Sequence, residues 1–157
     1  MPLQPGAQAP DVTLVSHTKQ PVSLSDYRGK QPVVVLFFPL AFSSTCTEEL
    51  CAVRDDIGSY EELEAEVFAV SVDSPYVLKR YREDTGAPYT FLSDFHREAA
   101  EAFEVLRTDP LGPGLRNTSD RSAFVIDRDG RIAYSWHSPN PSLIPPFDEI
   151  KDALRRL

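Results

Sequence analysis

Residues 33–51 read VVVLFFPLAFSSTCTEELC, and their pattern is the most informative in the chain. Its first part, residues 33–38, is a continuous apolar run of β-type residues, which is typical of a central strand buried on both faces. Pro39 ends the run, a short hydroxyl-rich loop follows, and Cys46 opens a segment with the pattern of a helix. Cys51 lies five positions further on, and the chain has no other cysteine. The strand-to-helix junction therefore holds both thiols of the protein.

Cys46 lies where an anionic sulfur is favoured. The thiolate is the nucleophilic form of cysteine, and the first turn of a helix offers unpaired N–H groups and about half a positive charge. We expect Thr45 to be the N-cap, because residues 45–48 fit a capping box with Glu48. Ser43 is the alternative N-cap, and it would make Cys46 the third helical residue. Glu48 and Glu49 oppose a thiolate, so a cation from elsewhere in the chain is needed.

The spacing Pro39-x-x-x-Ser43-x-x-Cys46 resembles the signature of the peroxiredoxin family. The resemblance implies that Cys46 is the peroxidatic nucleophile, that Pro39 shields it and that the hydroxyl of Ser43 orients the peroxide. In the family an arginine that opens a late strand holds the thiolate. Residues 121–127, RSAFVID, are similar to that strand, so the role of the required cation falls to Arg121.

Two subgroups of the family meet in this chain. Residues 37–42, FFPLAF, look most like the E-type alkyl hydroperoxide reductases, which are often one-cysteine enzymes. Residues 46–51, CTEELC, are similar to the Q-type group, in which the resolving cysteine lies five residues on, here Cys51. The Q-type resemblance also implies that Glu49 hydrogen-bonds the active-site arginine. The alternatives are that Cys51 is a buried packing residue and that Glu49 only complements the helix dipole.

The spacing of the two cysteines has a mechanical consequence. Thioredoxin-like exchangers normally carry Cys-x-x-Cys at this junction, whereas this chain has four residues between Cys46 and Cys51. On an intact helix the two Cα atoms would lie roughly 8–9 Å apart, beyond the ~7 Å limit for a disulfide. The first turns of the helix must therefore unwind before the two sulfurs can bond.

The order of predicted elements is that of an α/β protein with a thioredoxin-like fold. We expect a central mixed sheet flanked by helices, with an N-terminal β-hairpin as the usual peroxiredoxin addition. Strands are expected at residues 11–15, 21–24, 33–38, 67–72, 89–92, 121–127 and 131–136. Helices are expected at residues 45–57, with Gly58 as a stop or kink before a continuation over 60–66, and at 75–84, 97–105 and 146–157. Residues 106–120 form a long loop.

Composition limits the function classes. A chain of 157 residues is expected to form one domain, residues 1–157, and its net charge of -8 argues against nucleic acid or an anionic membrane as partner. No apolar stretch is long enough to span a bilayer and no signal peptide begins the chain, so we expect a cytoplasmic protein. His17, His96 and His137 are scattered, so no metal site is expected, and no bound cofactor is implied.

The sequence thus predicts a thiol peroxidase. Cys46 would reduce hydrogen peroxide, organic hydroperoxides or both, and its sulfenic acid would condense with Cys51. A thioredoxin- or glutaredoxin-like protein would then reduce the disulfide. One alternative is a one-cysteine enzyme resolved by an external thiol, and another is a thioredoxin-fold module without catalysis. The apolar residues 40–42 and 111–115 favour a homodimer.

Overall fold

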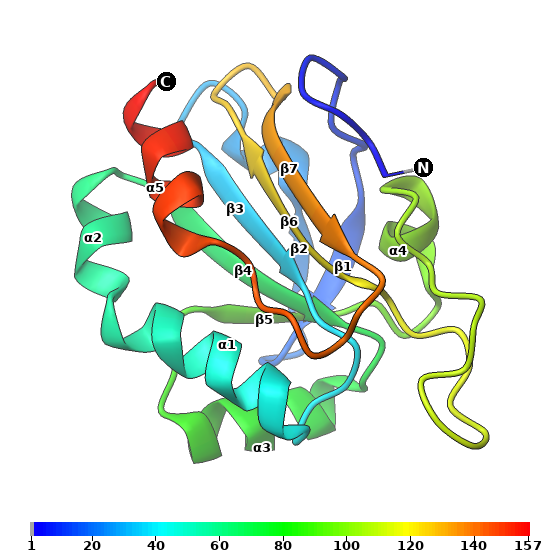
Figure 1. Ribbon diagram of the computed structural model, residues 1–157. Coiled ribbons are helices and arrows are strands. Elements are labelled where there is room, and N and C mark those ends of the chain that lie inside the picture. Colours follow the sequence, from blue (N-terminus) through cyan, green and yellow to red (C-terminus); the bar gives the residue numbers. More distant parts are fainter. Residues whose placement is uncertain (1) are drawn as a thin grey trace.

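A computed structural model describes residues 2–157 of the chain. Its centre is a seven-stranded sheet with the strand order β2-β1-β5-β4-β3-β6-β7 (Figure 1). The strands are β1 (Thr13–Ser16), β2 (Pro21–Ser23), β3 (Val33–Phe37), β4 (Glu66–Ser71), β5 (Thr90–Ser93), β6 (Arg121–Ile126) and β7 (Ile132–Ser138). The helices are the 3₁₀ turn η1 (Leu24–Tyr27), α1 (Ser44–Asp55), α2 (Ile57–Glu62), α3 (Pro75–Thr85), α4 (Glu98–Ala102) and α5 (Phe147–Arg155).

The sheet is mixed, as predicted for a thioredoxin-like fold. β3, β4 and β5 run parallel to one another, whereas β6 pairs antiparallel with β3 and β7 pairs antiparallel with β6. The predicted N-terminal hairpin is formed by β1 and β2, and β1 joins the sheet by antiparallel pairing with β5. The fold class inferred from the sequence is therefore confirmed.

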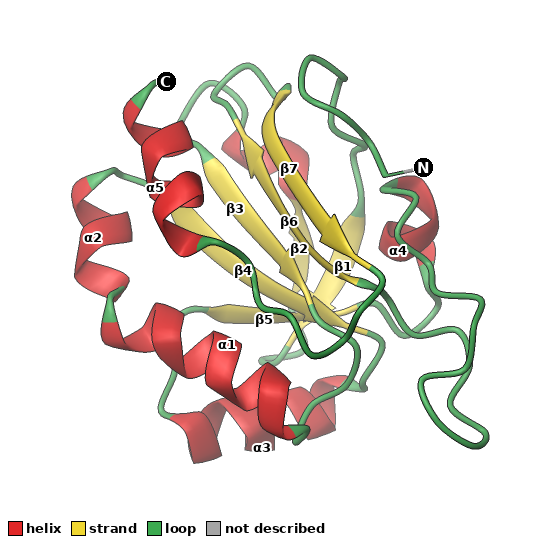
Figure 2. Ribbon diagram, viewed as in Figure 1, coloured by secondary structure: helices red, strands yellow, loops and turns green. Residues whose placement is uncertain are grey.

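All five residues of β3 are buried because both faces of the sheet are covered. The even-numbered residues, Val34 and Leu36, pack into a core with α1, α3 and α5. The odd-numbered residues, Val33, Val35 and Phe37, pack on the opposite side with α4 and η1. Figure 2 shows helices on both sides of the sheet. This double burial explains why the strand reads as a continuous apolar run rather than an alternating one.

The helix after β3 ends earlier than predicted. Gly58 is neither a stop nor a kink, because it lies inside α2, and the break falls at Asp56 between α1 and α2. Asp56 leaves helical geometry, with φ of −119° and ψ of 20°. Its carboxylate accepts hydrogen bonds from Ser59 and from Lys151 of α5. These two contacts stabilise the break and join it to the last helix.

The fourth helix is also shorter than the predicted 97–105. Arg97 and Glu104 both have left-handed backbone conformations, with φ near 60°, which an α-helix cannot include. The buried carboxylate of Asp94 accepts hydrogen bonds from the amides of Ala99 and Ala100 and so fixes the start of α4. The predicted long loop over 106–120 is present, closed by a bridge between Leu106 and Ser119.

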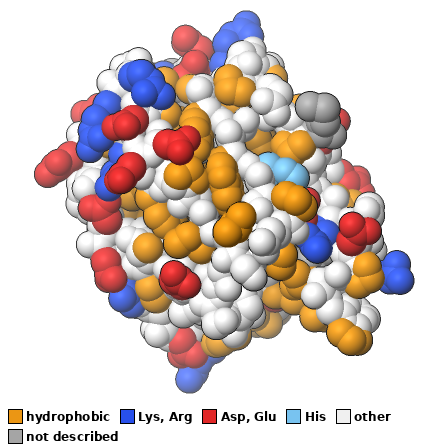
Figure 3. Space-filling view, viewed as in Figure 1, with side chains coloured by type: hydrophobic (Ala, Val, Ile, Leu, Met, Phe, Trp, Pro, Cys, Tyr) orange, Lys and Arg blue, Asp and Glu red, His pale blue; other side chains and the backbone are white. Residues whose placement is uncertain are grey.

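Side chains on the face with α1 and α5 are segregated by type. Figure 3 shows hydrophobic side chains gathered toward the centre of this face and most charged side chains toward its margin.

Among residues 2–157, no helix has the length and apolar character that crossing a membrane requires.

Candidate active site

Ser43, and not Thr45, is the N-cap of α1, so the expected capping box at Thr45 is wrong. Ser43 has extended backbone angles, and its carbonyl accepts hydrogen bonds from both the amide and the hydroxyl of Thr47. Its own hydroxyl donates to the carbonyl of Leu40, 3.2 Å away, rather than capping the helix. Cys46 is consequently the third helical residue, within the turn whose N–H groups are unpaired.

Arg121 lies beside Cys46, where the sequence predicts a cation. It opens β6, and the antiparallel register pairs Ser122 with Phe37 at the end of β3. The first residue of β6 therefore lies at the edge of the sheet where α1 begins. Arg121 Nη2 donates to the Sγ of Cys46 across 3.2 Å. Cys46 has 0% and Arg121 has 1% of its surface exposed, so this contact is made away from solvent.

Glu49 contacts the same guanidinium, as the Q-type resemblance implies. Arg121 Nη1 donates to Glu49 Oε1 across 2.6 Å, and the carboxylate is fully buried. The first turn of α1, where an acid would complement the helix dipole, contains no acidic residue, because Glu49 is the sixth residue of the helix. Burial raises the pKa of Glu49 to about 7, although its contact with Arg121 acts in the opposite direction. Burial lowers the pKa of Arg121, but Glu49 and Cys46 raise it by more, so the guanidinium stays charged.

The buried ion pair is incompletely satisfied. Within residues 2–157, Glu49 Oε2 and Arg121 Nε are buried and have no hydrogen-bond partner. Burying such atoms without a partner typically costs about 1–3 kcal/mol each. A buried ion pair with unpaired atoms is poor evidence for stabilisation. Stabilisation of the fold therefore does not account for this pair.

Backbone contacts hold the loop that leads into α1. Pro39 is buried, and the preceding residue, Phe38, donates to Val70 of β4 and accepts from the hydroxyl of Ser119. The amide of Ala41 donates to Asp73 Oδ2 across 2.8 Å. The sequence prediction missed Asp73. The position of Asp73 just after β4 could have revealed its role, because the neighbouring parallel strands β3 and β4 end at the same edge of the sheet.

Cys51 lies in the middle of α1 and is half-buried. Both cysteines are free thiols. The hydroxyl of Tyr89 donates to the carbonyl of Leu50 across 2.5 Å, and that of Tyr81 is 2.9 Å from the hydroxyl of Thr47. Both contacts secure α1 against the rest of the molecule. Of the predicted site residues, Arg121 contacts both Cys46 and Glu49, whereas Cys51 lies on α1 outside this cluster.

No group of three or more metal-binding side chains occurs in the described part of the chain.

The AhpC/TSA family matches residues 5–135. The chain belongs to this family. It is 32% identical over 157 residues to peroxiredoxin Bcp of Bacillus subtilis, covering 100% of this chain and 96% of the relative. It is 36% identical over 135 residues to alkyl hydroperoxide reductase E of Mycobacterium tuberculosis, covering 85% and 84% of the two chains.

Solved structures agree with this assignment. Peroxidoxin BcpB from Mycobacterium tuberculosis matches with a TM-score of 0.86 and 27% identity, over 99% of this chain and 98% of that one. A peroxiredoxin-like protein from Aquifex aeolicus shares the fold with a TM-score of 0.88, at 24% identity over 99% and 88% of the chains. The protein is a peroxiredoxin, a thiol peroxidase, and the alternative of a non-catalytic thioredoxin-fold module is set aside.

Proposed function

We propose that the thiolate of Cys46 attacks one oxygen of a hydroperoxide and breaks the O–O bond. The sulfur is oxidised to a sulfenic acid, and the departing oxygen takes a proton and leaves as water or an alcohol. The contact of 3.2 Å between Arg121 Nη2 and the Sγ of Cys46 is the observation that carries this proposal. A buried guanidinium can stabilise both the thiolate and the charge that develops on the peroxide.

Ser43 and the backbone N–H groups near Thr45 and Cys46 are proposed to bind the peroxide oxygens. The hydroxyl of Ser43 already donates its hydrogen to Leu40. Its lone pairs are free to accept a hydrogen bond, so Ser43 would receive the O–H of the hydroperoxide. Pro39, buried before the loop, would limit the access of water to the sulfenic acid. The substrates proposed are hydrogen peroxide and organic hydroperoxides.

We further propose that Cys51 resolves the sulfenic acid. Its thiol would displace water from the oxidised sulfur of Cys46 and form a disulfide, which a thioredoxin- or glutaredoxin-like dithiol would reduce. The intact helix Ser44–Asp55 keeps the two residues too far apart, so α1 must first open locally. A one-cysteine mechanism with an external thiol is the alternative, and the half-buried position of Cys51 is compatible with either.

Intact-mass analysis after one equivalent of peroxide tests this step. A loss of about two hydrogens indicates the intramolecular disulfide, and a gain of one oxygen indicates a persistent sulfenic acid. We expect the loss of two hydrogens in the wild type and the gain of one oxygen in Cys51→Ser. A persistent sulfenic acid in the wild type would favour the one-cysteine mechanism.

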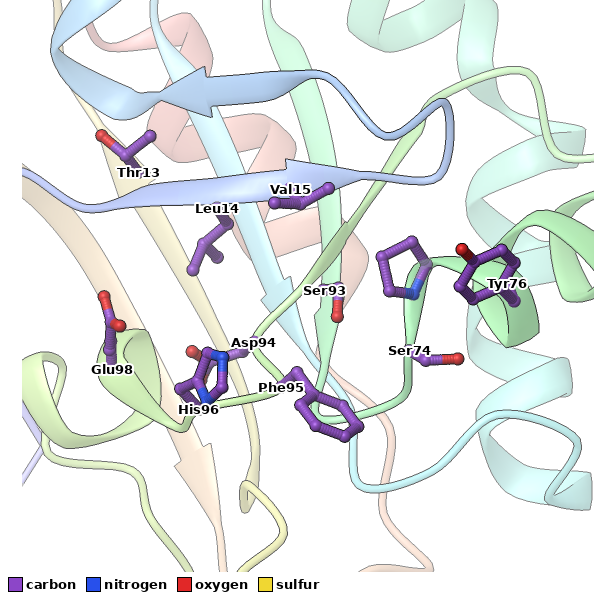
Figure 4. Close-up of a pocket in the computed structure, with 11 residues that line it drawn as sticks. Thr13, Leu14, Val15, Ser74, Tyr76, Ser93, Asp94, Phe95, His96 and Glu98 are labelled. Carbon is purple, nitrogen blue, oxygen red and sulfur yellow. The ribbon is translucent and has the colours of Figure 1, made fainter.

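The remaining proposals concern the whole protein. We propose that residues 1–157 act as one domain in the cytoplasm and form a homodimer, without nucleic acid or membrane partners. Exposed apolar side chains on the loops support the dimer, namely Phe42 and Leu115. A cavity of about 360 Å³ between β1 and the starts of α3 and α4 adds Tyr76 and Phe95, both exposed (Figure 4). Such apolar surface is typical of an interface.

A further inference from the structure

Three side chains form a polar cluster beside the active-site arginine. Asp120, the residue before Arg121, accepts from Arg107 Nη1 at 2.9 Å through Oδ1. Its other oxygen, Oδ2, lies 2.7 Å from Nε2 of His137 on β7. Arg107, Asp120 and His137, here called the Arg107 cluster, join the loop after α4, the start of β6 and the end of β7. None of these residues belongs to the site proposed above.

The Arg107 cluster is connected to the active site through a proline-rich segment. Residues 139–141 follow β7, and Arg107 Nη1 also donates to the carbonyl of Pro139 across 2.7 Å. Two residues on, the carbonyl of Pro141 accepts from Arg121 Nη2 across 3.0 Å. That nitrogen is the one that donates to Cys46. Figure 1 shows this segment, between β7 and α5, passing beside the start of β6.

The two contacts of Arg121 Nη2 constrain each other. A guanidinium Nη carries two hydrogens in a fixed plane, so one is aimed at Pro141 and the other at Cys46. Displacing the carbonyl of Pro141 would therefore tilt the whole guanidinium and move the hydrogen that reaches the sulfur of Cys46. The anchor of Arg107 at Pro139 holds one end of the segment that carries this carbonyl, and the hydroxyl of Ser138, which contacts the amide and the carbonyl of Asn140, holds its middle.

The burial of Arg107 points to a role for this anchor other than stabilising the fold. The side chains of Arg107 and Asp120 are only 16% and 14% exposed. In the described region, Arg107 Nε is buried without a hydrogen-bond partner, which is a cost to the fold. The side chain nevertheless directs a single nitrogen at both Asp120 and Pro139.

We propose that Arg107 is a positioning residue for the peroxidase reaction. It holds residues 139–141 so that the carbonyl of Pro141 orients Arg121 toward the sulfur of Cys46. Asp120 fixes the guanidinium of Arg107, and His137 fixes Asp120. This inference rests on the proposed roles of Cys46 and Arg121.

The test compares Arg107→Ala with Arg107→Lys in the Cys51→Ser background, where Cys46 is the only thiol. Stopped-flow fluorescence gives the rate of the first reaction with hydrogen peroxide, and alkylation against pH gives the thiolate fraction. Arg107→Ala should slow the peroxide reaction about tenfold and move the alkylation profile to higher pH by about half a unit. Arg107→Lys should recover part of both, since it can still reach Pro139. Arg116→Ala, an exposed arginine of the same loop, is the control and should change neither.

A double-mutant cycle separates positioning from a structural role. In the Arg121→Ala background, Arg107→Ala should shift the alkylation profile no further, because its effect acts through Arg121. Circular dichroism checks that each variant is folded, and Arg107→Lys replaces Arg107→Ala if the latter is not. If Arg121→Ala shifts the profile and the folded Arg107 variants do not, the inference about Arg107 is overturned. If Arg121→Ala itself does not shift the alkylation profile, the proposed role of Arg121 is overturned, and the inference about Arg107 is overturned with it.

Discussion

At the scale of single residues, one guanidinium is shared by two acidic groups. Arg121 donates to the sulfur of Cys46 with Nη2 and to Glu49 with Nη1. A charged Glu49 offsets part of the positive potential that would stabilise a thiolate. Its raised pKa of about 7 means that this offset changes around neutral pH. In the proposed mechanism Glu49 would therefore couple the charge of the site to pH as well as orient Arg121.

Glu49 should make the stability of the protein depend on pH. Its pKa rises from an ordinary 4.5 when unfolded to about 7 when folded. Between these values the folded state holds a proton that the unfolded state has released. The free energy of unfolding should therefore fall as pH rises from about 4.5 to about 7, by up to roughly 3 kcal/mol.

Denaturant unfolding of Glu49→Gln across this pH range measures that effect. The variant lacks the titrating group, so its stability relative to the wild type should increase steadily from low to neutral pH. Glu48→Gln, at the exposed neighbouring position, should follow the wild type. Parallel curves for the wild type and Glu49→Gln would show that Glu49 does not titrate in this window.

Among the elements, the proposed mechanism requires helix α1 to be folded during attack on the peroxide and locally open during disulfide formation. Tyr89 holds its middle through the carbonyl of Leu50, and Tyr81 holds its first turn through Thr47. The ring of Tyr89 is stacked on Phe91 at 5.5 Å between centroids, so the ring would remain in place without its hydroxyl. The hydroxyl can thus be removed with little change in packing.

Tyr89→Phe should speed disulfide formation without changing the peroxide step. Loss of one buried hydrogen bond costs about 1 kcal/mol, which corresponds to roughly fivefold easier opening of α1. Rapid mixing with peroxide, followed by quenching and mass analysis, gives the rate from sulfenic acid to disulfide. Tyr134→Phe, whose hydroxyl contacts Glu149 far from the thiols along the chain, is the control. An unchanged rate in a destabilised Tyr89→Phe would mean that opening does not break this bond.

Local patterns in the sequence predict most of these elements but not their ends. The apolar run of β3, the Pro75 start and Gly86 end of α3, and the hairpin of β6 and β7 are all encoded within a few residues. The break at Asp56 depends on Ser59 and also on Lys151, 95 residues away, and no local pattern records the second contact. Thr45 fits a capping box, but the extended backbone at Ser43 starts the helix earlier.

The site was predictable only in part for the same reason. Cys46 follows from its position at a helix start, but Arg121 is 75 residues away and was found through the family resemblance. Its contact depends on the register between β3 and β6. Asp73 and the Arg107 cluster depend on how loops meet at the edge of the sheet, which no periodic pattern records. Glu49 was left undecided because burial, which distinguishes its two roles, is a property of the folded molecule.

At the scale of the whole molecule, the apolar side chains around the active-site loop are exposed. Phe42 is 53% exposed and adopts a left-handed backbone conformation, with its ring 4.8 Å from that of Tyr81. A large apolar side chain exposed beside the active-site loop is typical of an interface.

Sedimentation should therefore give a dimer at micromolar concentrations, and Phe42→Ser should weaken it at least about tenfold. Leu143→Ser, which removes an equally exposed side chain from the segment after β7, should leave the dimer intact. A wild type that sediments as a monomer at these concentrations would overturn the proposed homodimer.

Cys46 is the proposed nucleophile of this peroxidase. The most direct measurement is the amount of hydrogen peroxide consumed in a single turnover by Cys46→Ser and by Cys51→Ser, the matched control on the same helix. We expect Cys51→Ser to consume one equivalent at close to the wild-type rate and Cys46→Ser to consume almost none. Consumption by Cys46→Ser at more than a few per cent of the wild-type rate would contradict the account.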